Sequence, residues 1–219
     1  MQKEEYFTPD NIAREAAAMA NALPINGRAA AFSLTNATLL IIDMQRYFLC
    51  ARSHAFLPAA PAIIPNINSL IEAFRNATRP IVFTRHANSA QDAGQMAVWW
   101  RELLTRDHPL GDIETTLHFH KDPIIKKTQY DAFFNTDLES RLRQSNTKQL
   151  VITGVSTHLC CESTARSAFG RGFAVFIPID GTATLNRELH SASLSGLAHA
   201  CAVPVLTGDL IAAAPGVSR

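Results

Sequence analysis

The sequence predicts an α/β fold, in which one domain is built on a doubly wound parallel sheet. Along the chain, apolar runs of strand length alternate with segments of helical periodicity, which is typical of right-handed βαβ units. The apolar runs are continuous rather than interrupted by polar residues, as in strands that helices cover on both faces. With 219 residues, no internal repeat and no linker-like stretch, the chain is the size of one such domain.

Six runs are the expected strands. The first is apolar until it ends in Asp43, the fourth stops at Gly154 and the sixth stops at Gly208. A glycine directly after an apolar run marks the end of an element. The runs occupy residues 37–43, 80–84, 124–125, 149–153, 173–179 and 203–207.

Three segments between these runs have apolar or small residues at positions i, i+3, i+4 and i+7, which predicts an amphipathic helix in each. The spacing is carried by Ile67, Leu70, Ile71 and Phe74, by Cys161, Thr164, Ala165 and Ala168, and by Leu194, Leu197, Ala198 and Cys201. Residues 87–122 are less regular, and we expect one helix near residues 95–105 and a long loop there. Long ordered loops beside a sheet often help to build a binding site.

Residues 1–33 precede the first strand and are expected to form a helical arm, with the domain itself spanning residues 34–219. A helix in the arm would place Ile12, Ala16, Met19 and Ala20 on one face. That apolar face can pack on a neighbouring subunit or on its own domain, and the sequence does not decide between the two. The first alternative predicts a homo-oligomer.

The overall composition excludes several classes of protein. The chain has 20 Lys and Arg against 19 Asp and Glu, a net charge of +1, which argues against nucleic acid as a partner. No apolar run reaches the roughly 18–20 residues of a membrane span, so no membrane partner is expected. Two early glutamates without a long apolar stretch behind them argue against a secretory signal, and the four cysteines are expected to be free thiols. We therefore expect a cytoplasmic protein.

Chemically reactive side chains follow the expected strands, at the point where each strand ends. Asp43 ends the first strand, Arg85 and His86 follow the second, Lys127 follows the third, and Cys160 lies just beyond the fourth. Open parallel sheets bind ligands outside the carboxyl ends of their strands. An acid, an amine and a thiol at this edge would form a nucleophile set that acts on a small-molecule substrate.

Cys160 is the most informative of these residues. Residues 154–166 have the pattern of a strand end, a tight turn and a helix start, with Thr157 at the N-cap position. In the first helical turn the helix dipole would lower the pKa of the Cys160 thiol, and the backbone N–H of Cys160 could hold an oxyanion. The alternative is a buried cysteine that packs as a small apolar residue, which is our interpretation of Cys161.

Two further residues could serve such a thiol. Asp43 could act as a general base, or it could be a solvated acid at the end of a strand. Lys127 could keep Asp43 ionised, but Lys126 carries the same charge, and charge alone does not choose between them.

The sequence gives no support for a metal or an organic cofactor. The histidines and cysteines are scattered, and none has a zinc-type spacing such as C-x-x-C or H-E-x-x-H. A glycine-rich phosphate-binding motif is missing as well. We therefore expect a cofactor-independent protein without a metal site.

Three motifs stand at the ends of the first, third and fourth expected strands. The first reads LIIDMQ at residues 40–45 and is followed by Phe48. The second reads KTQYDAF at residues 127–133, and the third reads GVSTHLC at residues 154–160. In this order, and over roughly residues 35–210, the sequence resembles the isochorismatase-like cysteine hydrolase superfamily.

The resemblance implies a six-stranded parallel sheet and a catalytic triad of Asp43, Lys127 and Cys160, and so it selects Lys127 over Lys126. It also implies a cis peptide bond between Val155 and Ser156, which turns the Ser156 N–H toward the oxyanion beside that of Cys160. Members of the superfamily form dimers or higher assemblies, which again predicts a homo-oligomer.

The resemblance also narrows the reaction. Siderophore-pathway isochorismatases look similar around His158 but carry a small residue at the position of Cys160, so a thiol there favours amide cleavage. The Asp-x-His zinc pattern of nicotinamidases is missing from residues 85–88, and residues 133–136 resemble the ureidoacrylate and N-carbamoyl amidohydrolase branch. Asp131 and Cys161 depart from the Ser and Val that are common at these two positions. We predict a cysteine hydrolase that cleaves a C–N bond of a small amide, carbamoyl or ureido compound through a thioester.

Other functions stay open. An isochorismatase-type vinyl-ether hydrolase would use Asp43 as an acid, and Cys160 would then be incidental. A catalytically idle binding protein on the same fold is a second alternative. A thiol redox protein using Cys160 and Cys161 is less favoured, because a bridge between adjacent cysteines is strained.

Eight residues close to these strand ends are expected to bind the substrate. Arg46 and Arg85 could each pair with a carboxylate, which predicts an anionic group on the substrate. Five aromatic residues would form the remaining walls and exclude water: Phe48, Trp99, Trp100, Tyr130 and Phe133. The full set is Gln45, Arg46, Phe48, Arg85, Trp99, Tyr130, Phe133 and His158.

Overall fold

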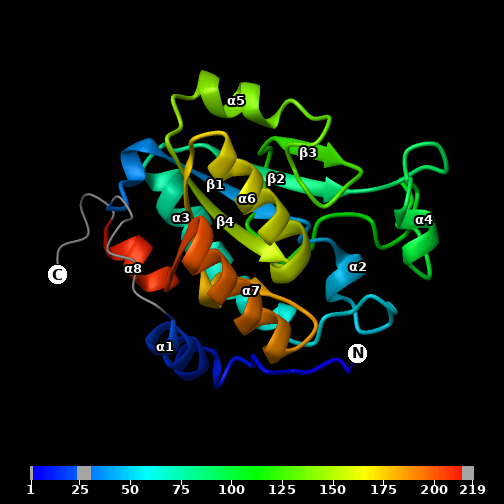
Figure 1. The fold of residues 1–219 in the computed structure, drawn as a ribbon, viewed down its shortest axis with the longest axis horizontal. Coiled ribbons are helices and arrows are strands. Elements are labelled where there is room, and N and C mark those ends of the chain that lie inside the picture. The colour runs from blue at the N-terminus through cyan, green and yellow to red at the C-terminus, as the bar shows by residue number, and fades with distance from the viewer. Residues whose placement is uncertain (1, 24–30, 214–219) are drawn as a thin grey trace.

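In the computed structural model of the chain, a parallel sheet lies between layers of helices (Figure 1). The structure describes residues 2–23 and 31–213, so part of the predicted arm and the end of the predicted domain lie outside the described residues. Within the described residues the sheet has seven strands in the order β3-β2-β1-β4-β5-β7, with β6 paired to the end of β4. The strands are β1 (Ala37–Ile42), β2 (Ile81–His86), β3 (Ile124–Lys127), β4 (Gln149–Val155), β5 (Ala174–Pro178), β6 (Thr182–Ala183) and β7 (Ala202–Val205).

The predicted α/β class and doubly wound parallel sheet are confirmed, and all six predicted strands are present. Strand β6 was not predicted, because Asp180, Gly181 and Thr182 have the composition of a turn. It is two residues long and pairs only with Gly154 and Val155 at the end of β4. Strands β2, β3 and β4 are longer than predicted at their carboxyl ends, because ladder pairing with their neighbours continues beyond the apolar runs. The added residues are 85–86 in β2, 126–127 in β3 and 154–155 in β4.

The three helices predicted from their periodicity are confirmed as α3, α6 and α7. The helix expected near residues 95–105 is a single turn, since α4 ends at Trp99 and most of its side chains face solvent. Without a core to pack on, a longer isolated helix is only marginally stable. None of the described helices is both long and apolar enough to cross a lipid bilayer. The α-helices are α1 (Ile12–Ala22), α2 (Arg46–Leu49), α3 (Ile64–Asn76), α4 (Met96–Trp99), α5 (Leu138–Gln144), α6 (Glu162–Gly170), α7 (Arg187–Ala200) and α8 (Thr207–Ala212).

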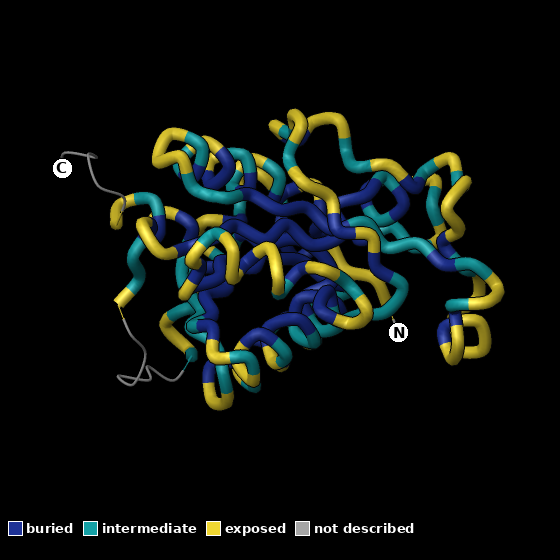
Figure 2. The backbone as a smooth tube through the Cα atoms, turned by 90° about the horizontal axis from the view of Figure 1, so that it is seen from above, coloured by how far each residue is buried: buried dark blue, intermediate teal, exposed yellow. Residues whose placement is uncertain are grey.

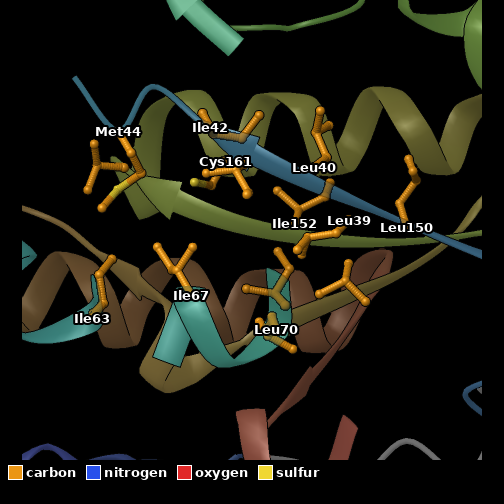
Figure 3. Close-up of a cluster of buried hydrophobic side chains, with 14 of the residues drawn as sticks. Leu39, Leu40, Ile42, Met44, Ile63, Ile67, Leu70, Leu150, Ile152 and Cys161 are labelled. Atoms are coloured by element: carbon orange, nitrogen blue, oxygen red, sulfur yellow. The ribbon is translucent and has the colours of Figure 1, made fainter. Parts of the chain in front are cut away.

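The hydrophobic core lies on both faces of the two central strands. Every residue of β1 and β4 is buried, and the buried strands run through the middle of the molecule beneath exposed loops and helix surfaces (Figure 2). Ile67 and Leu70 of α3 pack toward one face of these strands, and Cys161 packs toward the other (Figure 3). Cys161 therefore behaves as the small apolar residue that the sequence predicted.

Strands β1 and β4 come unusually close together at their carboxyl ends. Gly154 pairs with Ile42 and has a φ of +110°. A Cβ atom at Gly154 would lie 2.1 Å from the carbonyl oxygen of Ile42, so only glycine fits at this position. The close approach brings together the residues that follow the two strands.

The N-terminal arm packs against its own domain. The buried face of α1 consists of Ile12, Ala16 and Met19, and this helix contacts the turn Ile179–Gly181. Upstream of α1, Phe7 is fully buried in the main core. Of the two alternatives for the apolar face of the arm, the structure shows docking on the same chain. The homo-oligomer stays a prediction, supported by the family resemblance and not by this face.

Candidate active site

The order of the strands reverses between β1 and β4, and the predicted triad meets at this point. Asp43 follows β1, Lys127 is the last residue of β3, and Cys160 lies in the π-helical turn Thr157–Cys161 after β4. In an open parallel sheet such a reversal leaves a crevice at the carboxyl ends of the strands. The fold therefore brings three residues that are distant in the sequence to one place.

Lys127 links the other two members of the triad. Its Nζ lies 2.7 Å from Asp43 Oδ2 and 3.4 Å from Cys160 Sγ, and it also donates a hydrogen bond of 2.9 Å to the carbonyl oxygen of Gln129. The side chains of Asp43 and Lys127 are both completely buried. Although Asp43 Oδ2 makes this ion pair, it has no well-aligned hydrogen bond within the described residues. That oxygen is thus available to accept a proton.

Of the two neighbouring lysines, the structure places Lys127 and not Lys126 beside Asp43 and Cys160. Neighbouring residues in a strand face opposite sides of the sheet, so Lys127 points into the buried site while Lys126 is exposed. Burial by itself lowers the pKa of Lys127, but Asp43 and Cys160 raise it, and the net value is about 12. Lys127 is therefore a permanent positive charge beside the thiol at neutral pH.

Thr84 of β2 positions the carboxylate, and the sequence analysis missed it. Its hydroxyl donates a hydrogen bond of 2.6 Å to Asp43 Oδ1 and accepts one of 3.0 Å from the backbone N–H of Asp43. These bonds fix Asp43, whose φ of 47° lies in the left-handed region. A buried threonine next to a strand end was the available signal, but an apolar strand that ends in threonine is too common to stand out.

We expect Thr84→Val to lower kcat by about tenfold with little change in KM, because the carboxylate loses the donor that orients it; such a bond is worth roughly 1–3 kcal/mol. The matched control is Thr38→Val. Thr38 lies at the other end of β1, and its hydroxyl is buried 2.7 Å from the hydroxyl of Thr147. Steady-state kinetics and thermal melts of both variants separate positioning from stability. Equal kcat in the two variants would show that Asp43 does not need Thr84.

The thiol of Cys160 is neutral at rest, which corrects the expectation of a lowered pKa. Burial raises the pKa of Cys160, Lys127 lowers it and Asp43 raises it, with a net value of about 12. Desolvation next to a carboxylate outweighs the dipole of a short helical turn. The sulfur must therefore lose its proton as it attacks, and Asp43 is the base beside it.

The turn that carries Cys160 also differs from the expectation. Thr157 is not an N-cap, because its hydroxyl pairs with Nδ1 of His190 at 2.9 Å and no side chain caps the turn. The turn begins after Ser156, whose carbonyl oxygen accepts a hydrogen bond from the N–H of Cys161. The peptide bond between Val155 and Ser156 is cis, as the resemblance implied.

Cys160 lies on the wall of a cavity of about 270 Å³. Much of the wall is apolar or aromatic, and Ser156 contributes to it beside Cys160. The aromatic part of the wall consists of Tyr47, Phe48, Trp100 and Tyr130, and the polar part includes Lys3, His54, His86, Asn88, Glu102 and His158. A cavity of this size and lining suits a small, largely apolar molecule.

A model of the isochorismatase domain matches residues 37–209. The chain belongs to the isochorismatase family. Nicotinamidase 3 of Arabidopsis thaliana is 38% identical to it over 168 residues, which are 74% of this chain and 80% of that protein. Enterobactin synthase component B of Escherichia coli (strain K12) is 32% identical over 186 residues, 84% of this chain and 65% of that protein.

The fold is also shared with solved structures. A cysteine hydrolase from Pseudomonas syringae pv. phaseolicola superposes with a TM-score of 0.81 over 86% of this chain and 98% of that one, at 22% sequence identity. At that identity the likeness shows the fold. Family membership makes this chain an isochorismatase-family hydrolase, and the cysteine in its site supports action on C–N bonds.

Three of the predicted substrate-binding residues line the cavity of this isochorismatase-family protein: Phe48, Tyr130 and His158. Tyr130 is held by a hydrogen bond of 2.8 Å that Trp100 Nε1 donates to its hydroxyl. His158 is held by Thr184, whose hydroxyl lies 2.5 Å from His158 Nδ1. These side chains are thus fixed in the wall before a substrate arrives.

The two predicted arginines do not line the cavity. Arg85 donates a hydrogen bond of 2.8 Å to the carbonyl oxygen of Gly111 and pairs with Asp112 at 3.2 Å on the other side of β2. Because side chains alternate along a strand, His86 faces the cavity and Arg85 faces away. Arg46 begins α2, a one-turn helix that turns Tyr47 and Phe48 toward the cavity instead.

The other three predicted substrate-binding residues also lie outside the wall of this cavity. Gln45 is fully buried and clamps two strand ends together, since its amide exchanges hydrogen bonds with the backbone of His86. Trp99 is 78% exposed, while the next residue, Trp100, lines the cavity. Phe133 stacks on Phe173 in the core, away from the cavity.

His86 and Asn88 line the cavity but were not among the predicted substrate-binding residues. His86 Nε2 lies 2.9 Å from Asn88 Oδ1, and Asn88 Nδ2 donates a hydrogen bond of 2.9 Å to the carbonyl oxygen of Thr128. Burial and the charge of Lys127 lower the pKa of His86, Asp43 raises it, and the net value is about 4, so its imidazole is neutral. Across the described part of the chain, no cluster of three or more His, Cys, Asp and Glu side chains could hold a metal ion.

Proposed function

We propose that this chain hydrolyses the C–N bond of a small amide, carbamoyl or ureido compound through a thioester on Cys160. The observation that carries the proposal is the position of Lys127 Nζ, 2.7 Å from Asp43 Oδ2 and 3.4 Å from the Cys160 sulfur, beside a cavity of about 270 Å³. Covalent acyl transfer needs a nucleophile, a base and a source of positive potential within this range. The similarity to a protein named Nicotinamidase 3 supports the same type of bond.

Acylation begins when the Cys160 thiol transfers its proton to Asp43 as the sulfur bonds to the substrate carbonyl carbon. The carbonyl π electrons move to oxygen, and the backbone N–H groups of Ser156 and Cys160 hold the resulting oxyanion. A donor of this kind typically contributes about 10²–10³-fold in rate. Lys127 keeps its proton and offsets the negative charge. As the C–N bond breaks, Asp43 protonates the departing nitrogen, which leaves as ammonia or an amine.

Deacylation uses the same carboxylate a second time. Asp43 takes a proton from a water molecule whose oxygen bonds to the acyl carbon of the thioester. The C–S bond then breaks, and the Cys160 sulfur regains the proton from Asp43. The products are a carboxylic or carbamic acid and the free enzyme, so the cycle consumes one water and needs no redox partner.

The lining of the cavity supports a small acyl group with an apolar body. Tyr47, Phe48 and Trp100 offer flat faces. His86 is neutral because burial lowers its pKa, and burial also lowers the pKa of His158. Neutral imidazoles can exchange hydrogen bonds with a carboxamide or ureido group without placing a charge next to it.

An ammonia-release screen over simple carboxamides and N-carbamoyl compounds tests this proposal. We expect at least one compound to release ammonia in proportion to turnover, and the intact mass of rapidly quenched enzyme to increase by the mass of its acyl group. Cleavage of a vinyl ether without any ammonia release would instead support the isochorismatase-type reaction. Binding of these amides without any turnover would support an inactive binding protein.

A further inference from the structure

The N-terminal segment forms part of the cavity wall, although it lies outside the matched isochorismatase domain of residues 37–209. Lys3 and Cys160 line the same cavity. The segment leads from α1 past α7, where the rings of Tyr6 and Phe7 pack against His190, and ends near the loop after α2 (Figure 1). A residue at the start of the chain thus borders the substrate site.

Hydrogen bonds on one flank fix the course of this segment. The backbone N–H of Glu4 donates a hydrogen bond of 2.9 Å to the carbonyl oxygen of Leu185, a residue that also lines the cavity. The hydroxyl of Tyr6 accepts a hydrogen bond of 2.9 Å from the backbone N–H of Thr184. Lys3 is therefore held over the cavity by the residues that follow it and does not depend on its own side chain for position.

The ammonium group of Lys3 has unused hydrogen-bonding capacity. It donates one hydrogen bond of 2.5 Å, to the carbonyl oxygen of His54, and forms no ion pair with any described residue. An ammonium has three N–H donors, so two remain. Glu102 also lines the cavity, but both of its carboxylate oxygens are engaged, with His54 at 3.0 Å and His108 at 3.2 Å. Lys3 is an exposed residue that borders the cavity, so its two remaining N–H donors are accessible to an anionic acceptor on a bound molecule.

The remaining polar groups of the wall are neutral or already paired. His86 and His158 are uncharged because burial lowers their pKa, and Asn88 has no charge. The arginines expected to bind an anion, Arg46 and Arg85, lie outside the wall. Among the described residues that line this cavity, Lys3 is the cation without an acidic partner.

We propose that Lys3 is a specificity-determining residue that binds a carboxylate on the substrate, at a distance from the amide that Cys160 attacks. The inference rests on the proposed function, since it takes this cavity as the place where the amide substrate binds. The anionic group that the sequence analysis expected on the substrate would then pair with Lys3 instead of Arg46 or Arg85. Selection would act on binding, because the contact with the remote carboxylate is the same before and during the chemical step.

Matched acid and ester substrates test the inference. We suggest 4-carbamoylbenzoate against its methyl ester, and N-carbamoylglycine against its methyl ester. For the wild type we expect KM to be about tenfold lower for an acid than for its ester, as for one hydrogen bond to a charged group. Lys3→Met should remove this preference through KM with little change in kcat, and Lys3→Arg should retain it. The control Lys148→Met removes an exposed lysine far from the cavity and should leave the preference unchanged.

A binding measurement separates the failure of this inference from the failure of the proposed reaction. Calorimetry with the Cys160→Ala variant, with and without Lys3→Met, gives dissociation constants for the same ligands without turnover. If acids bind more tightly than esters only when Lys3 is present, the inference holds even where the wild type hydrolyses neither ligand. If amides are hydrolysed but acids and esters bind equally, or if the preference survives Lys3→Met, Lys3 is not the anion-binding residue. Lys3→Gln serves as a second neutral variant should Lys3→Met fail to give a cooperative thermal melt.

Discussion

The Cys160→Ala variant is expected to lose about 10⁴-fold or more in kcat, as is found when the nucleophile of a covalent hydrolase is removed. The side chain is small and faces the cavity, so its loss should change the free energy of unfolding by only about 1 kcal/mol. Ammonia release measures the first effect, and a thermal melt measures the second. A large loss of activity in a normally folded protein would identify Cys160 as the reacting group.

Cys161→Ala is the matched control, because it removes a sulfur from the next residue. Cys161 packs in the core and does not line the cavity, so activity should change by no more than a few fold. The acyl adduct should map to the peptide at Cys160 specifically. Thiol alkylation alone would not identify the nucleophile, since hydrogen bonds at Arg52 lower the pKa of Cys50. Full activity in Cys160→Ala would contradict the thioester and favour the vinyl-ether reaction, in which the sulfur has no role.

Asp43→Asn is expected to lower the rates of both acylation and deacylation by about 10³-fold, since one carboxylate serves as proton carrier in both steps. The substitution keeps the size of the side chain and an oxygen that can accept the hydrogen bond from Thr84. Substrate binding should therefore be retained. Single-turnover kinetics, with the intact mass of quenched enzyme, resolve the two steps. If the thioester forms at the normal rate and accumulates, Asp43 is the base for deacylation only.

The same substitution should destabilise the protein, because it leaves the charge of Lys127 buried without a counterion. Removing one partner of a buried ion pair costs about 3–5 kcal/mol. Adding Lys127→Met to Asp43→Asn removes the unpaired charge, so the double variant should recover much of the stability while remaining inactive. Recovery of activity together with stability would show that the single variant fails by misfolding and not by loss of a base.

The sequence by itself determined the fold class and, with the family resemblance, the three candidate residues of the triad. Continuous apolar runs and the i, i+3, i+4, i+7 spacing depend only on residues that are close together in the chain. In the structure the apolar runs form strands and the spaced segments form helices. Asp43 and Cys160 stood out because each follows an apolar run, and the ends of parallel strands meet at one edge, whereas only the family resemblance selected Lys127 over Lys126. The three motifs then connected these strand ends to a known family of hydrolases.

The tertiary structure decided which neighbours act with the triad. Alternate residues of β2 face opposite sides of the sheet, and this alternation decides that His86 and not Arg85 lines the cavity. A continuous apolar run does not show which residues face which side, because helices cover both faces of the sheet. The neutral state of the Cys160 thiol depends on how completely the fold removes water from it, and the role of Thr84 depends on the pairing of β1 with β2. Lys3 could reach the site only because the arm folds back over its own domain. Each of these features arises from distances between residues far apart in the sequence, which local patterns do not encode.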